Sequence, residues 1–277
     1  MIELLSYEFF RNALLAAFFA AISCGIIGTY IVSRRIVFIS GGITHASFGG
    51  IGIGYYLGIN PIFGAAVFAV LSALGIEYTS RKTEVREDSA IAILWALGMA
   101  IGVIFIFITP GYAPNLMSYL FGNILTVTTT DLYLLAGLSL IIVLFYIMQF
   151  KNILYIAFDE EFARARRLPV NMIKYVMISL IALTIVFNIR VVGIILVISL
   201  LTIPQTIANM FVKRFIGIMM LSVVIAMIGT LTGLMLSYLF DIPSGAAIIF
   251  FLVILFFLAR IIKWIMRYRV QGAEDRD

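Results

Sequence analysis

The chain has 277 residues, of which 63% are hydrophobic and only 12% are charged, and its mean hydropathy is +1.14. Soluble domains carry about 25% charged residues, so this composition indicates an integral membrane protein and excludes an ordinary soluble domain. The net charge of +5 comes from short basic clusters between apolar runs, which favours a role in membrane topology over nucleic-acid binding. Cys24 is the single cysteine, so a disulfide within the chain is excluded.

Apolar runs long enough to cross a membrane recur along the whole chain, because a transmembrane helix needs about 20 mostly apolar residues. The run at 36–58 is rich in glycine and is compatible with a broken or re-entrant element. We predict an all-α polytopic protein with eight to ten transmembrane helices, a single membrane domain at 1–266 and a cytoplasmic tail at 267–277. The nine candidate spans lie near 9–32, 36–58, 62–79, 90–109, 131–149, 171–188, 191–211, 215–239 and 245–262.

The basic residues give the orientation of these spans. With Arg34 and Arg35 placed in the cytoplasm, nine spans put 17 of the 19 lysines and arginines inside and leave only Arg11 and Arg190 outside. Cytoplasmic loops are enriched in Lys and Arg, so the amino end is predicted outside and the carboxyl end inside. Arg190 either faces an acidic partner or extends its charge toward water.

The main cytoplasmic feature is the charged segment at 157–169. In its stretch 158–169, six of twelve residues are charged, and the three carboxylates precede the three arginines, the order that suits a helix macrodipole. Glu160 and Glu161 precede Arg164 by four and three residues, so local ion pairs support a helix. The charged residues are Asp159, Glu160, Glu161, Arg164, Arg166 and Arg167.

The same segment has an apolar face. Phe158, Phe162 and Ala165 fall on one side of a helix, and Pro169 is predicted to end it. This pattern is typical of a short amphipathic helix that lies in water or against another protein. The longest external segment, 110–130, combines turn residues, a short apolar run and a threonine cluster, and is predicted to form a short helix at the outer membrane face.

Motifs of common enzymes are absent from the sequence. It contains no Gly-x-x-x-x-Gly-Lys-[Ser/Thr] phosphate-binding loop, no His-Glu-x-x-His and no Gly-x-Ser-x-Gly. A membrane-embedded enzyme would need a catalytic pair that we do not find. A secondary transporter or channel would need charged groups along several spans, and this chain offers almost none.

His45, the one histidine, lies in a glycine-rich span. A neutral imidazole is a good ligand for zinc, manganese or iron, although a buried histidine can equally bind a neighbouring carbonyl group. The glycines between 41 and 58 permit close helix packing and also suit backbone that lines a cavity.

Proline interrupts a later apolar run, 192–206, near its predicted inner end. Pro204 frees a backbone carbonyl, and polar side chains lie nearby, although an ordinary proline kink would look the same. These polar residues are Ser199, Thr202, Gln205 and Thr206.

Four stretches together resemble the membrane permeases of ATP-binding-cassette (ABC) importers for zinc, manganese and iron. They are Gly-Gly-Ile-Thr-His-Ala-Ser at 41–47, Ser-Tyr-Leu-Phe-Gly-Asn-Ile-Leu at 118–125, Val-Gly-Ile-Ile-Leu-Val-Ile-Ser-Leu-Leu-Thr-Ile-Pro at 192–204 and Asp-Ile-Pro-Ser-Gly-Ala-Ala-Ile at 241–248. They occur in the family's order and cover nearly the whole chain.

The resemblance implies a fold related to the cobalamin and siderophore importer permeases. It implies a homodimer in a bacterial or archaeal plasma membrane, surrounded by lipid, with two ABC ATPase subunits inside and a solute-binding protein outside. ATP and Mg²⁺ would bind the ATPase subunits, and this chain would hold no cofactor of its own.

The resemblance also assigns roles to residues. The segment 158–168 matches the coupling helix that docks on the ATPase, with contacts from Phe158, Asp159, Glu160, Glu161, Phe162, Arg164 and Arg166. His45 would bind the metal, and Gly41, Thr44, Ser199, Thr202 and Pro204 would line or gate the pathway. Family members commonly carry Asp four residues before the histidine, whereas this chain has Gly41, so the site lacks that carboxylate.

The sequence therefore predicts a permease subunit that imports a transition-metal ion by alternating access and itself catalyses nothing. The alternatives are an ABC permease for a metal chelate or another small solute, and a transporter that works without an ATPase.

Overall fold

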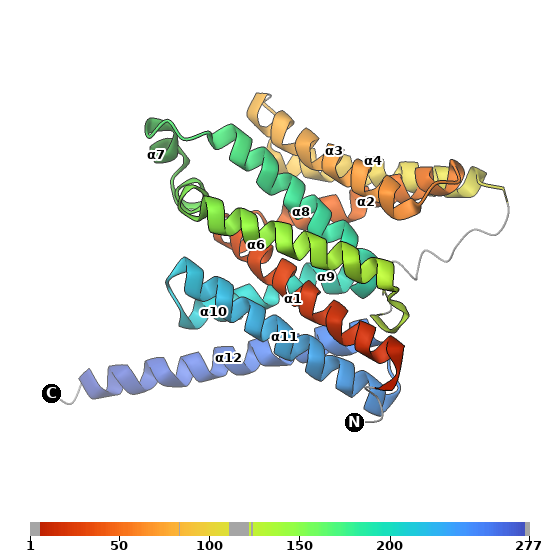
Figure 1. Ribbon diagram of the computed structural model, residues 1–277. Helices are drawn as coiled ribbons and strands as arrows, with labels where there is room; N and C mark the ends of the chain where they lie inside the picture. The colour runs from red at the N-terminus through yellow and green to blue at the C-terminus, as the bar shows by residue number, and fades with distance from the viewer. Residues whose placement is uncertain (1–5, 83, 111–121, 123, 275–277) are drawn as a thin grey trace.

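The computed structural model describes residues 6–82, 84–110, 122 and 124–274, and every regular element in these ranges is helical. Figure 1 shows long helices packed side by side. The elements are α1 (Glu8–Ser33), α2 (Val37–Tyr56), α3 (Pro61–Lys82), α4 (Glu87–Ile108), the short 3₁₀ helix η2 (Ile124–Thr126), α6 (Thr129–Phe158), α7 (Glu160–Ala165), α8 (Val170–Val192), α9 (Ile194–Leu200), α10 (Ile203–Phe211), α11 (Phe215–Phe240) and α12 (Ser244–Glu274).

Nine stretches of the described chain are long and apolar enough to cross a membrane, which confirms the nine-span prediction. Eight of them are single helices, and α9 and α10 together make the seventh span, at Ile194–Phe211. The glycine-rich run is a continuous helix, α2, so the re-entrant interpretation is wrong. Its glycines pack against other helices, which stabilises a regular helix there despite its many glycines.

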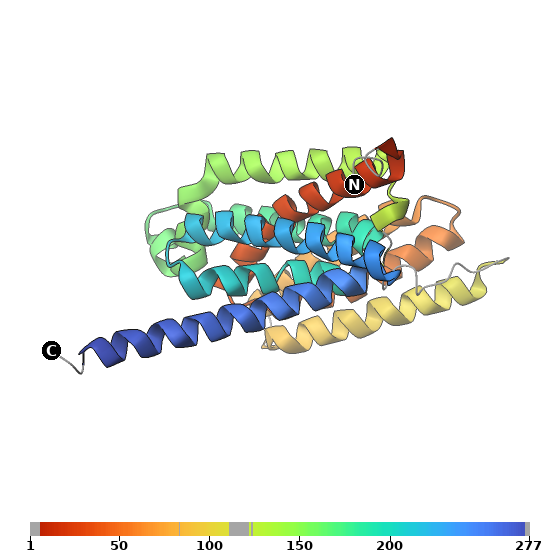
Figure 2. The ribbon, with the colours of Figure 1, turned by 90° about the horizontal axis from the view of Figure 1, so that it is seen from below.

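The ends of the helices agree with the orientation predicted from the basic residues. Figure 1 shows α7, the turn from α10 to α11 and the carboxyl end on the left, and the amino end on the right. The left side is thus the predicted cytoplasmic side. Figure 2 shows that the last helix extends beyond the other helices on this side.

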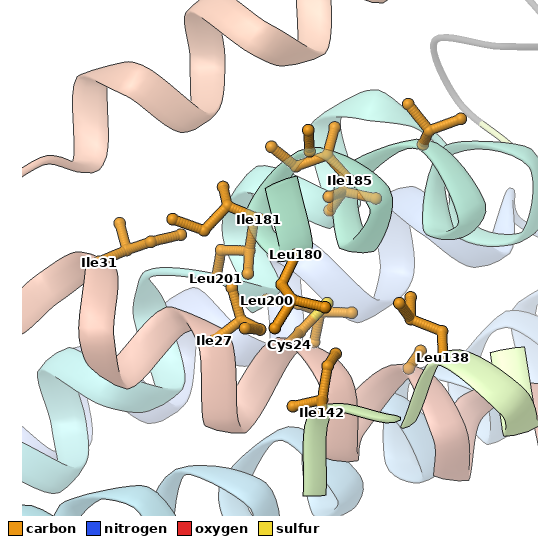
Figure 3. Packing of buried hydrophobic residues seen from close by; sticks show 14 of the residues in the cluster. Cys24, Ile27, Ile31, Leu138, Ile142, Leu180, Ile181, Ile185, Leu200 and Leu201 are labelled. Atoms are coloured by element: carbon orange, nitrogen blue, oxygen red, sulfur yellow. The ribbon is translucent and has the colours of Figure 1, made fainter. Parts of the chain in front are cut away.

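Two groups of helices hold the bundle together. Isoleucine and leucine side chains from α1, α6, α8 and α9 interlock in a buried core, part of which Figure 3 shows around Cys24, Ile27 and Ile181. Beside this core, α2 packs closely on α3 and α4. A side chain at Gly50 would collide with the backbone of Gly64 on α3, and one at Gly52 with that of Gly102 on α4. Such close backbone contact is how small residues promote helix association in lipid.

The outer surface helix predicted over 110–130 falls mainly on 111–121 and 123, which lie outside the described residues. Of the rest, Ile124–Thr126 form the 3₁₀ helix and Thr129 already begins α6. A capping box of Thr128 and Asp131 fixes this start.

Candidate functional site

The charged segment at 157–169 folds into two parts of different origin. α6 continues to Phe158, so this residue belongs to the preceding transmembrane helix. Asp159 then has an extended backbone, with φ of −149°, and its carboxylate accepts a 2.9 Å hydrogen bond from the backbone N–H of Phe162. This N-cap starts α7, which has six residues.

α7 ends earlier than the sequence predicted, and Pro169 does not end it. Arg167 takes the left-handed conformation, with φ of +57°, and its N–H donates to the carbonyl of Arg164 at 2.9 Å. The N–H of Leu168 donates to the carbonyl of Ala163 at 3.1 Å. These two bonds form a Schellman motif, which closes the helix before the proline is reached. Pro169 instead lies directly before α8, as its N-cap residue.

The apolar face of this segment also differs from the prediction. Ala163 is the buried residue of α7, whereas Ala165 is exposed. Phe158 and Phe162 are 66% and 42% exposed, and Phe162 contacts the Tyr155 ring edge-on at 5.5 Å between centroids. The two phenylalanines therefore present aromatic surface outward at the cytoplasmic end of the bundle.

Ion pairs hold α7 against the membrane helices. Glu160 accepts from Arg164 at 2.8 Å, as its i,i+4 spacing predicted, and from Lys174 of α8 at 3.0 Å. Arg34, just after α1, lies 3.7 Å from Glu160 and donates to the carbonyl of Ile156 at 2.7 Å. Arg164 binds Asn171 as well, at 3.0 Å. Of the residues predicted to contact an ATPase, Glu160 and Arg164 thus make intramolecular bonds.

Lys174 extends this set of charges to a third membrane helix. Its ammonium group lies 3.0 Å from Glu77 of α3, and both side chains are only 12% exposed. No local pattern predicts this pair, because Glu77 and Lys174 lie 97 positions apart in the chain. Burial by itself would raise the pKa of Glu160, but hydrogen bonds and charges from Arg164 and Lys174 outweigh it and lower the pKa to about 2.

His45 lies on α2 and faces α4. Its ring stacks on that of Trp95, with centroids 4.3 Å apart and planes 3° apart. Its buried Nδ1 atom has no hydrogen-bond partner among the described residues. The interpretation of His45 as bonded to a neighbouring carbonyl therefore has no support at Nδ1. This nitrogen makes no hydrogen bond within the described chain.

The other two predicted pathway residues of α2, Gly41 and Thr44, have different environments. A side chain at Gly41 would meet Trp95 at an ordinary contact distance of 3.9 Å, so Gly41 and His45 face the same tryptophan. Thr44 is fully buried and donates its hydroxyl to the carbonyl of Ser40 at 2.5 Å. In the described part of the chain, no group of three or more His, Cys, Asp or Glu residues could enclose a metal ion. Within the described part of a single copy, His45 therefore has no further His, Cys, Asp or Glu ligands grouped around it.

The seventh span breaks in two between Leu200 and Ile203, in its middle rather than near its inner end. Pro204 has no N–H to donate to the carbonyl of Leu200, four residues earlier. The side-chain amide of Gln205 donates to that carbonyl at 2.9 Å and to the carbonyl of Cys24 on α1 at 2.9 Å. Gln205 therefore supplies the missing bond and attaches the break to the neighbouring helix.

The hydroxyl groups at this break bind their own helix. Ser199 donates to the carbonyl of Ile195 at 2.9 Å, and Thr202 donates to that of Ile198 at 2.8 Å. A cavity of about 270 Å³ lies beside the break, between α10 and α12. It is lined by Thr202, Ile203, Thr206, Val253 and Phe256. α2 packs against α9, so His45 and Ser199 lie on neighbouring helices, whereas α7 lies at the cytoplasmic end.

Arg190, the outlier in the charge pattern, has its acidic partner within the chain. Its guanidinium lies 3.1 Å from the carboxylate of Asp131, which is buried at the start of α6. This pair joins the outer ends of α6 and α8 and accounts for an arginine on the outer side.

Comparison with known proteins places these features in a family. The model of the ABC 3 transport family matches residues 6–263. An uncharacterized membrane protein of Synechocystis is 44% identical over 90% of this chain and 89% of its own length. A manganese transport system membrane protein, MntC, of Halalkalibacterium halodurans is 35% identical over 93% of this chain and 88% of its own. Its namesake in Listeria monocytogenes is 31% identical over 92% and 91%.

Solved structures resemble the fold as well. A chain of PsaBC from Streptococcus pneumoniae, solved in complex with Fab, superposes with a TM-score of 0.83 and 30% identity over 94% of this chain and 95% of its own. An inward-facing structure of a putative metal-chelate type ABC transporter gives a TM-score of 0.66 at 17% identity, which shows a shared fold alone.

Proposed function

This chain belongs to the ABC 3 transport family, and we propose that its cargo is a transition-metal ion, with Mn²⁺ preferred over Zn²⁺ and iron. It is the membrane-spanning permease subunit of a metal ABC importer and a multi-pass protein of the bacterial plasma membrane. The observation that carries the proposal is agreement over nearly the full length, in sequence and in fold, with relatives named for manganese transport and with PsaBC.

The site supports transient binding of the cargo. The free Nδ1 of His45 is a nitrogen ligand that suits Mn²⁺, Zn²⁺ and iron, and it lies in the membrane beside Trp95. Gly41 leaves out a carboxylate that would hold the ion more tightly on the same helix face. A permease must release its cargo, so a weak site is compatible with transport.

ATP hydrolysis belongs, in this proposal, to two separate ATPase subunits that bind ATP and Mg²⁺, while a solute-binding protein delivers the metal from outside. The permease works as a homodimer whose two copies border the pathway. Exposed Phe158 and Phe162 on the cytoplasmic side support an ATPase dock at α7. Binding and hydrolysis of ATP would then shift the helices between outward-open and inward-open states.

The test is metal uptake into proteoliposomes that carry the permease, its ATPase and its solute-binding protein. Wild-type permease should accumulate radioactive Mn²⁺ only with ATP, and unlabelled Zn²⁺ and Fe²⁺ should compete to different extents. His45→Ala should slow uptake several-fold while the ATPase still binds, since the variant loses the one nitrogen ligand in α2. Gly41→Asp should retain bound metal longer, because a carboxylate adds attraction to a cation in a low dielectric.

Asp88→Asn serves as the matched control, because Asp88 is a polar residue of α4 that pairs with Arg86 in water. It should transport at the wild-type rate. ATP-independent uptake would instead support a transporter that works without an ATPase. Wild-type uptake by His45→Ala, together with unchanged metal retention by Gly41→Asp, would show that His45 is structural.

A further inference from the structure

Lys174 occupies an unusual place among the charges at the cytoplasmic end. Its ammonium group lies 3.0 Å from Glu160 on α7 and 3.0 Å from Glu77 on α3, and so joins two carboxylates that belong to different elements. Lys174 itself is on the first turns of α8. One cation thus connects the short cytoplasmic helix to two membrane helices.

The environment of this linkage makes it more than a surface ion pair. Lys174 and Glu77 are each 12% exposed, and both border a small cavity of about 60 Å³ together with Tyr30 and Ser80. Ion pairs in water contribute little, whereas sheltered pairs are screened less and hold a fixed geometry. Removing the cation would leave two carboxylates facing the same space without it, which is costly in a sheltered place.

The linkage continues into the membrane through packed backbones. Glu77 lies near the cytoplasmic end of α3, and α3 packs on α2 where Gly64 and Gly50 bring the two backbones into direct contact. α2 carries His45. Because the two backbones are already in direct contact at these glycines, a displacement of α3 toward α2 must move α2 as well. A mechanical route therefore runs from α7 through Lys174 and Glu77 to the helix of His45.

The join between α6 and α7 allows the short helix to move relative to α6. A single extended residue, Asp159, separates them, so a small rotation there displaces α7 without bending α6. Arg34 meanwhile binds the carbonyl of Ile156 and holds the end of α6 in place. The charged linkage at Glu160 is thus a direct connection by which a displaced α7 can pull on α3.

We propose that Lys174 is a positioning residue that couples α7 to the metal pathway, by linking Glu160 to Glu77 and so moving α2 with α7. This inference rests on the proposed docking of the ATPase at α7. It assigns to Lys174 a role in transmission rather than in binding metal or ATPase, because its charge is directed into the protein.

The test compares wild type with Lys174→Met and Glu77→Gln in the complete reconstituted importer. Three quantities are measured: ATPase binding, ATP hydrolysis stimulated by the loaded solute-binding protein, and Mn²⁺ transported per ATP. Both variants should bind the ATPase as wild type does, but should transport about fivefold less Mn²⁺ per ATP, the size of change expected when a coupling contact is lost. Lys174→Arg should restore the ratio, since it keeps the charge. Asp88→Asn is the control and should leave the ratio unchanged.

The double variant Lys174→Met with Glu77→Gln should be no worse than Lys174→Met alone, because both changes break one linkage. An unchanged ratio of Mn²⁺ to ATP in both single variants would overturn the proposal. If Lys174→Met fails to fold, the neutral Glu77→Gln still decides it. Failure of the proposed function has a different signature: the wild-type complex would then show no ATP-dependent uptake, or no ATPase bound at α7.

Discussion

Glu160 illustrates how a single carboxylate can organise a short segment. It forms ion pairs with Arg164 within α7, with Lys174 on α8 and, at a longer distance, with Arg34 after α1. Gln205 has a comparable role inside the membrane, where its amide replaces the N–H that Pro204 lacks. In both places one side chain connects an irregular part of the backbone to a regular helix nearby.

We expect the attachment of α7 to depend on pH only in acid. The pKa of Glu160 is lowered from 4.5 to about 2, so its contribution is fully present above pH 4.5 and is lost as the pH falls through 2. An environment-sensitive fluorophore on Phe162→Cys, in a Cys24→Ser background, should report a transition between these values. The attachment should not change between pH 5 and 8.

Glu160→Gln is the comparison for this titration. The amide cannot titrate, so the fluorophore should report a weakened attachment at neutral pH and lose the transition between pH 4.5 and 2. A transition of wild-type size in Glu160→Gln would assign the titration to another group.

At the scale of elements, α7 is too short to be stable alone. Isolated helices below about 12 residues are marginal in water, and α7 has six. Its N-cap Asp159, the Schellman motif at Arg167 and the ion pairs of Glu160 hold it instead. These bonds use its polar groups and leave Phe162 exposed outward, with the guanidinium of Arg166 5.1 Å above its ring.

Phe162 should be a central contact with the ATPase. Phe162→Asp should weaken ATPase binding about tenfold or more, because a buried aromatic anchor commonly supplies more than 1 kcal/mol at an interface. Binding of the purified ATPase to the permease in nanodiscs measures this. Phe162→Leu, which keeps an apolar side chain, should bind within a few-fold of wild type.

Phe211→Asp is a second comparison, because Phe211 is as exposed as Phe162 but ends α10. Equal loss of binding in Phe211→Asp and Phe162→Asp would mean that α7 has no special part in docking.

At the scale of the whole molecule, two groups of helices pack in different ways. α1, α6, α8 and α9 form a core of interlocking isoleucine and leucine, whereas α2, α3 and α4 approach through glycine. The second group carries His45 and reaches the cytoplasmic charges through Glu77. The glycine contacts of the second group bring backbones directly together, so a displacement of one of these helices toward its neighbour is passed on to that neighbour.

The orientation of the whole bundle predicts which loops water-soluble reagents reach. In a Cys24→Ser background, Leu57→Cys between α2 and α3 should react with an impermeant thiol reagent in intact cells, since this loop is exposed and is predicted to lie outside. Lys213→Cys, in the turn between α10 and α11, should react only after the membrane is opened. The reverse pattern would invert the topology and place α7 outside the cell.

The sequence by itself determined the number of spans and predicted their orientation, with an amphipathic segment on the cytoplasmic side. These are local properties: a span needs enough consecutive apolar residues, and orientation follows the count of Lys and Arg in each loop. The resemblance to metal importer permeases rested on short motifs that can likewise be read in order along the chain. The end of α7 was mispredicted because Arg167 takes the left-handed conformation and closes the helix before Pro169. Glycine is the residue that usually takes this conformation at the end of a helix, so an arginine there does not signal it.

Only the tertiary structure decided which distant residues meet. The stacking of His45 on Trp95, the pairing of Arg190 with Asp131 and the linkage of Lys174 to Glu77 each join positions that are far apart in sequence. No periodicity encodes such pairs, because they depend on how helices pack against one another rather than on where each helix begins and ends. The proposed coupling of α7 to the metal pathway therefore depends on the fold and could not be inferred from the order of residues.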